Sequence, residues 1–95
     1  MEGRKEKRNP QRLPVLLSSL AQPLRAEPAA TEDVSSLGVR VQTLRPWELG
    51  GIVLLRSLQD EPLARARVVY CKSLPSRAFG LGLEFLSRTD AWPAR

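Results

Sequence analysis

Short runs in which apolar and polar residues alternate recur about every ten residues along the chain, and they constrain its fold more than any other feature. The clearest run is 37–44, where Val39 and Val41 alternate with Arg40 and Gln42. Successive side chains of an extended backbone point to opposite faces of a sheet, so this run predicts a strand that is buried on one face only. The chain shows little of the three- and four-residue spacing that a helix needs.

Six such runs are separated by turn-forming residues. Proline stands at both ends of 23–28, which predicts a loop, and Pro46 with two glycines makes 45–51 a connector. Segment 29–34 is polar, and we expect it to be an edge strand. The six predicted strands are 14–20, 29–34, 37–44, 52–58, 63–72 and 79–85. This pattern predicts an all-β fold, either a small antiparallel barrel or a sandwich, and closure into a barrel would remove exposed strand edges.

The alternation also predicts which side chains form the core. On the fifth predicted strand, the side chains expected to point inward are Ala64, Ala66, Val68 and Tyr70. On the sixth, they are Phe79, Leu81, Leu83 and Phe85. Arg65 and Arg67 are expected to point outward, where they could form a basic patch, although a solvated strand face is the commoner explanation. We interpret Trp47 as a plug over one end of the core rather than a platform for stacking on a base.

The composition excludes most catalytic and metal chemistry. A chain of 95 residues allows one small domain with a modest core. Cys71 is the only cysteine and there is no histidine, which removes an internal disulfide, Ser-His and Cys-His catalysis, and most zinc sites. A lone cysteine suits the cytosol, and no apolar run is long enough to span a membrane. We therefore expect a cytoplasmic, non-enzymatic protein without a cofactor or membrane insertion.

Positive charge is concentrated at the N-terminus. The net charge is +5, and residues 1–12 hold five basic and two acidic residues, which gives +3 of it. The basic residues of this stretch are Arg4, Lys5, Lys7, Arg8 and Arg12. We expect a flexible arm here, and its charge favours an anionic partner such as a phosphate-bearing ligand, a nucleic acid or a lipid.

Two short patterns offer groups for binding such a partner. Arg8 and Arg12 form an RxxxR spacing that ends at the first predicted strand. Asp33 and Ser35 are two positions apart, so on an extended backbone a carboxylate and a hydroxyl leave the same face. Gly38 can take a positive φ or let a ligand approach its backbone closely. The simpler interpretation is that Asp33, Ser35 and Gly38 form a turn between two strands.

The order of these patterns resembles the PilZ domain family. RxxxR is followed by DxSxxG, whose Asp33 lies 21 positions after Arg12, and then by a closing strand that contains Gly-Leu-Glu-Phe. The resemblance extends over roughly residues 7–86. It implies a six-stranded antiparallel barrel, in agreement with the predicted strands.

The resemblance also implies a division of the chain into three parts. These are a flexible basic arm over 1–12, a PilZ-like β-barrel over 13–87 and a short tail over 88–95. Members of the family usually carry a C-terminal helix. Here Pro93 limits its length, so we expect a helix that is short or absent, with Trp92 packed back on the barrel.

What the resemblance implies for function is binding of cyclic di-GMP, a bacterial second messenger, and transmission of a conformational change to a partner protein. Arg8 and Arg12 would fork onto a guanine or stack on it while neutralising phosphate. Asp33 would accept hydrogen bonds from the guanine N1 and N2 donors, and Ser35 would add a further bond to the base edge. Gly38 would admit the ring without a clash.

Several alternatives stay open. Arg4 and Arg8 also form an RxxxR pair, in which case Arg12 would be an outer contact. A degenerate PilZ module would bind no nucleotide and act as a protein-interaction adaptor, although such members typically lose the arginines or the aspartate that this chain keeps. A basic barrel for RNA or single-stranded DNA would need exposed aromatic residues. The chain has five aromatics, three of them expected to point inward, so we expect no nucleic-acid polymer as a partner.

Overall fold

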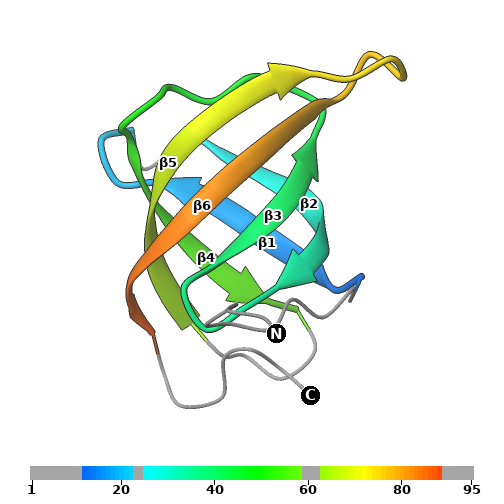
Figure 1. The fold of residues 1–95 in the computed structure, drawn as a ribbon. Helices are drawn as coiled ribbons and strands as arrows, with labels where there is room; N and C mark the ends of the chain where they lie inside the picture. The colour runs from blue at the N-terminus through cyan, green and yellow to red at the C-terminus, as the bar shows by residue number, and fades with distance from the viewer. Residues whose placement is uncertain (1–11, 23–24, 59–62, 89–95) are drawn as a thin grey trace.

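The alternating runs form six antiparallel strands that close into a barrel (Figure 1). The computed structural model describes residues 12–22, 25–58 and 63–88. The strands are β1 (Pro14–Ser19), β2 (Ala26–Val34), β3 (Gly38–Thr43), β4 (Ile52–Ser57), β5 (Leu63–Ser73) and β6 (Phe79–Arg88). Around the barrel they follow the order β1-β2-β3-β6-β5-β4, and β1 pairs with β4 to close it. The predicted all-β fold of six antiparallel strands is confirmed, and the described residues contain no helix.

Two of the expected parts lie largely outside the described residues. Most of the basic arm, including Arg4 and Arg8, is one of them. The tail from residue 89 onward, with Trp92 and Pro93, is the other. Within the described part of the chain, there is no helix of the length and hydropathy needed to cross a bilayer.

The barrel interior is filled by side chains from alternate positions of every strand. On β3, Val39 and Val41 are at most 1% exposed, whereas Arg40 between them is exposed, as the alternation predicts. The buried apolar core consists of Val15, Leu17, Val34, Val39, Val41, Trp47, Val53, Leu55, Ala64, Ala66, Val68, Leu81 and Leu83. Full burial of one valine or leucine side chain contributes about 1.5–3 kcal/mol, so the core holds all six strands together.

β2 begins at Ala26, within the segment that the sequence predicts to be a loop. Pro28 pairs with Leu16 of β1 and lies beyond the last pair that joins β2 to β3, Ala30 with Gln42. A proline has no N–H to donate, and it is accommodated here because only one neighbouring strand lies beside it. The prediction of an edge strand at 29–34 was also wrong, because β2 pairs with both β1 and β3.

A β-bulge in β5 reverses the direction of the side chains that follow it. Val68 pairs with Leu83, and Tyr70 pairs with the next residue of β6, Gly82, so β5 has one extra residue between the two pairs. After the bulge, Cys71 packs against the core and the Tyr70 ring lies on the outer surface over Gly82. The prediction that Tyr70 points inward was therefore wrong, while Ala64, Ala66 and Val68 are buried as expected.

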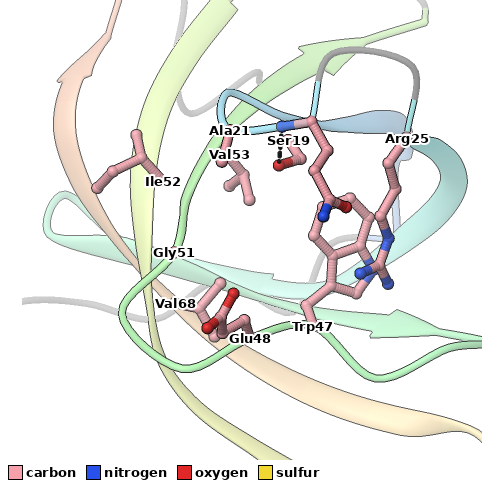
Figure 2. Close-up of a pocket in the computed structure, with 10 residues that line it drawn as sticks. Ser19, Ala21, Arg25, Trp47, Glu48, Gly51, Ile52, Val53 and Val68 are labelled. Carbon is pink, nitrogen blue, oxygen red and sulfur yellow. Dashed lines mark hydrogen bonds between the residues drawn. The ribbon is translucent and has the colours of Figure 1, made fainter.

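Trp47 closes the end of the barrel at which β3 leads into β4. It is 5% exposed, and its indole Nε1 donates to Glu27 Oε1 over 3.0 Å. The other oxygen, Glu27 Oε2, accepts a hydrogen bond from the backbone N of Leu44 over 2.5 Å. The Arg25 guanidinium lies over the indole with Cζ 4.0 Å from the ring centre (Figure 2). The interpretation of Trp47 as a plug is confirmed.

Candidate functional site

The arm joins the barrel beside the second half of β2. The backbone N of Leu13 donates to Thr31 Oγ1 over 2.8 Å, and the backbone N of Thr31 donates to Leu13 O over 3.0 Å. These bonds fix the start of β1, and with it the exposed Arg12, at the barrel end that carries the β2–β3 turn (Figure 1). The first half of the RxxxR pattern, Arg8, lies outside the described residues.

Asp33 faces Arg40 across the β2–β3 pair. The two residues are register partners because a bulge between Thr31 and Asp33 shifts β2 by one residue against β3. Arg40 donates to Asp33 Oδ2 from Nε over 2.8 Å and also from one terminal guanidinium nitrogen. The Asp33 side chain is 8% exposed and that of Arg40 is 44% exposed, so the carboxylate lies beneath the guanidinium.

Ser35 lies past the end of β2 and holds the β2–β3 turn. Its hydroxyl accepts hydrogen bonds from the backbone N of Leu37 and of Gly38, each over 3.2 Å, and donates to Gly38 O over 3.3 Å. Ser35 N also donates to Gly38 O over 2.8 Å, and the residue is 1% exposed. The hydroxyl therefore serves the turn rather than an extended face shared with Asp33.

Gly38 marks a close approach of two backbones. It opens β3 opposite Glu84 of β6 and is buried. A Cβ on Gly38 would lie 2.2 Å from the carbonyl oxygen of Leu83. The glycine is thus required by the packing of β3 on β6.

A shallow groove of about 210 Å³ runs beside this turn. It is lined by Leu37, Gly38, Val69, Leu83 and Glu84. The barrel end therefore brings together Arg12, the Asp33–Arg40 pair, the turn and an open groove. The predicted residues that the structure describes all lie in this region, but Asp33 and Ser35 have protein partners of their own.

Sequence reasoning missed Arg40 and Tyr70 as members of the site. Arg40 was assigned only to the solvated face of β3, because the alternation does not show which residue of β2 stands opposite it. The pKa of Arg40 is raised above its ordinary value, chiefly by the hydrogen bond to Asp33 and to a smaller extent by the Tyr70 side chain beside it. A search for an acidic residue opposite each exposed arginine could have suggested the pair, but the bulge hides the register.

Other features of the described surface are less suited to a nucleotide. The cavity beside Trp47 and Arg25, at the opposite end of the barrel, has a volume of about 60 Å³, which suits a few water molecules (Figure 2). Arg65 and Arg67 point outward as predicted, and Arg67 Nε lies 3.8 Å from Glu84 Oε1. Among the described residues, no group of three or more side chains could hold a metal ion.

Comparisons with known proteins identify relatives of this barrel. Residues 2–91 match the PilZ domain. Among solved structures, the chain is similar to the inhibitor of motility (MotI/DgrA) of Bacillus subtilis, with a TM-score of 0.76 and 19% sequence identity. The match covers 96% of this chain and 46% of that chain, so the shared fold spans less than half of the Bacillus protein. No curated protein matches the chain.

Proposed function

Because the chain belongs to the PilZ domain family, we propose that it binds cyclic di-GMP and passes the resulting conformational change to a partner protein. PilZ domains are non-catalytic receptors, so the chain is a binding module and not an enzyme. The proposed ligand contacts are Arg8, Arg12, Asp33, Ser35 and Gly38. The lone cysteine and a second-messenger ligand both suit a cytoplasmic receptor.

The observation that carries the proposal is the pair of hydrogen bonds between Leu13 and Thr31. They hold the root of the arm at the same barrel end as Asp33 and the turn that follows it. An arm that starts there needs only a short reach to bring its arginines over a ligand bound beside the turn. Ligand binding would then order the arm, and the entropy lost in ordering it favours moderate rather than extreme affinity.

The chemistry of the ligand suits the groups at this end. Cyclic di-GMP carries two phosphates and two guanines. The guanidinium of Arg12 can pair with phosphate or with the guanine O6 and N7 acceptors. The Asp33 carboxylate is an acceptor for the guanine N1 and N2 donors. Each good bidentate pair with guanine should contribute about 1–3 kcal/mol, by analogy with base recognition in DNA.

Isothermal titration of the purified chain tests the proposal. Saturable heat with cyclic di-GMP, but not with GTP, is the expected result, and the stoichiometry distinguishes a single ligand from a stacked pair. The Arg12→Ala variant should lose most of the affinity. Arg45→Ala, at the exposed start of the β3–β4 connector at the other end of the barrel, is the matched control and should bind like the wild type. A folded chain that gives no heat at high ligand concentration would refute the proposed function.

One observation favours a second candidate, a PilZ module that binds a partner protein without any nucleotide. The hydroxyl of Ser35 is held by the β2–β3 turn, and the carboxylate of Asp33 is paired with Arg40. These contacts give the DxSxxG pattern a role in holding the barrel end together. The same titration separates the two candidates, since an adaptor would bind neither cyclic di-GMP nor GTP.

A further inference from the structure

Four residues form one row across the outer surface of β2, β3, β6 and β5. Asp33 pairs with Arg40, Arg40 pairs with Gly82, and Gly82 pairs with Tyr70. Two of the four, Asp33 and Tyr70, enter the row only because β2 and β5 each carry a bulge directly before them. The patterns that carry the family resemblance do not include Arg40 or Tyr70, and they include Gly82 only as the first residue of Gly-Leu-Glu-Phe.

Within the row, Arg40 is the cation that pairs with the Asp33 carboxylate. A carboxylate that is 8% exposed is costly to bury unless a cation and hydrogen bonds compensate for the lost water. Arg40 supplies both, and it directs two of its N–H groups at the same oxygen, Oδ2. This geometry restrains the rotation of the carboxylate.

Tyr70 lies on the side of Arg40 that faces away from Asp33. Its ring lies on the backbone of Gly82, where a Cβ would be 2.2 Å from the ring atom Cε2. Gly82 therefore allows the ring to lie flat on β6, next to the register position of Arg40. The Tyr70 side chain is close enough to Arg40 to contribute, after Asp33, to the raised pKa of that guanidinium.

We propose that Arg40 is a positioning residue of the cyclic di-GMP site, which holds the Asp33 carboxylate ionised and in one orientation for the guanine edge, and that Tyr70 and Gly82 support it. This inference rests on the proposed function. A carboxylate distinguishes guanine by accepting from N1–H and N2–H together, which requires the carboxylate to be held in one orientation. The same hydrogen bonds from Arg40 to Asp33 would also allow the opposite role, in which Arg40 competes with the ligand for the carboxylate. In that case, removal of Arg40 would strengthen binding.

The test compares cyclic di-GMP with cyclic di-IMP, which lacks the exocyclic N2 amino group. Both are titrated into the wild-type chain and into Arg40→Gln, Arg40→Lys and Gly82→Ala. Arg45→Gln is the control, because Arg45 is also an exposed arginine but lies at the other end of the barrel. Circular dichroism and thermal unfolding of each variant show whether the barrel is intact.

We expect Arg40→Gln to weaken cyclic di-GMP binding by about tenfold or more, and to reduce the preference for cyclic di-GMP over cyclic di-IMP. Arg40→Lys keeps the charge but not the two-donor geometry, so it should recover part of the affinity and less of the preference. Gly82→Ala displaces Tyr70 and should reduce the preference in the same direction. If Arg40 had only a structural role, its variants would be less stable or would bind both ligands more weakly by the same factor. The ratio of the two affinities would then not change.

The outcomes separate this inference from the proposed function. If folded Arg40→Gln and Arg40→Lys bind cyclic di-GMP as tightly as the wild type and keep its preference over cyclic di-IMP, the inference is overturned. The proposed function is then left intact. Stronger binding by Arg40→Gln would also overturn it, because Arg40 would then compete with the ligand. If Arg40→Gln fails to fold, Arg40→Lys and Gly82→Ala decide. A wild-type chain that binds neither ligand would overturn both.

Discussion

The backbone of Gly38 lies so close to that of Leu83 that a side chain on the glycine would collide with the leucine carbonyl oxygen at 2.2 Å. The glycine of the DxSxxG pattern thus has a structural role that does not depend on a ligand. It lets β3 begin against β6 directly after the turn that Ser35 holds. The barrel and the candidate site share this residue.

Gly38→Ala should therefore destabilise the barrel whether or not ligand is present. The added methyl must displace backbone rather than a flexible side chain, which typically costs about 1–3 kcal/mol. Urea unfolding followed by circular dichroism measures the change. Ser36→Ala, in the same turn and exposed, should stay within about 0.5 kcal/mol of the wild type. A Gly38→Ala chain of normal stability that has lost only ligand binding would show that the glycine serves the ligand instead.

Glu27 should contribute to stability through the two donors that it accepts. The variant Glu27→Ala leaves the buried indole N–H of Trp47 and the partly buried backbone N–H of Leu44 without their acceptor. An unsatisfied buried donor such as the Trp47 indole N–H costs about 1–3 kcal/mol, and the partly buried donor costs less because water can reach it. Chemical denaturation should show this loss of stability. The control is Glu48→Ala, which removes an exposed acid next to Trp47 in the β3–β4 connector and should have little effect. Equal stability of the two variants would contradict the assigned role of Glu27.

Arg25 should stabilise the same end of the barrel by stacking as well as by charge. Its guanidinium covers the Trp47 ring, and one terminal nitrogen donates to Pro46 O over 2.6 Å. A cation on an indole near the surface contributes about 0.5–1 kcal/mol, and a loss of 1 kcal/mol lowers the melting temperature of a domain this small by about 4–8 °C. We expect Arg25→Ala to melt several degrees lower and Arg25→Lys to recover only part of the difference, because lysine has no planar group to stack. Full recovery by lysine would show that charge alone matters.

Binding of cyclic di-GMP should weaken as ionic strength rises. The ligand is a dianion and the arm is basic, and the screening length falls from about 10 Å at 0.1 M salt to about 3 Å at 1 M. Titrations over this range should show a steady loss of affinity, with a flatter dependence for Arg12→Ala. Adding sucrose at matched osmolality is the control and should leave the affinity unchanged. Affinity that does not respond to salt would argue against contacts between arginine and phosphate.

The strands were predictable from the alternation of apolar and polar residues wherever one face of the strand is buried and the other is exposed to solvent. Val39 and Val41 on β3, and Leu81 and Leu83 on β6, lie in the core as their spacing of two predicts. The start of β2 was not predictable in this way. Pro28 reads as a loop residue, and only its place beyond the last β2–β3 pair explains why a strand can contain it.

The candidate site was less predictable than the fold, because it depends on register. A bulge adds one residue without leaving a composition signal, so Tyr70 was assigned to the wrong face, and Arg40 was not recognised as the partner of Asp33. Ser35 was expected to share an extended face with Asp33, but β2 ends at Val34 and the hydroxyl turns back to the hairpin. Local chemistry selected the candidate residues, and only the pairing of the strands shows what they contact.

The closed order of the six strands also limits how a signal can leave the protein. Many sheet proteins recruit a partner by β-augmentation, in which an extended peptide hydrogen-bonds to an unpaired edge. In this barrel each strand has two neighbours, so unpaired edges among the described residues are confined to short stretches, such as the start of β2 around Pro28. Under the proposed function, a partner would therefore mainly recognise side chains on the outer wall, the connecting turns or the arm itself, and these are the parts that a ligand at the β2–β3 turn would rearrange.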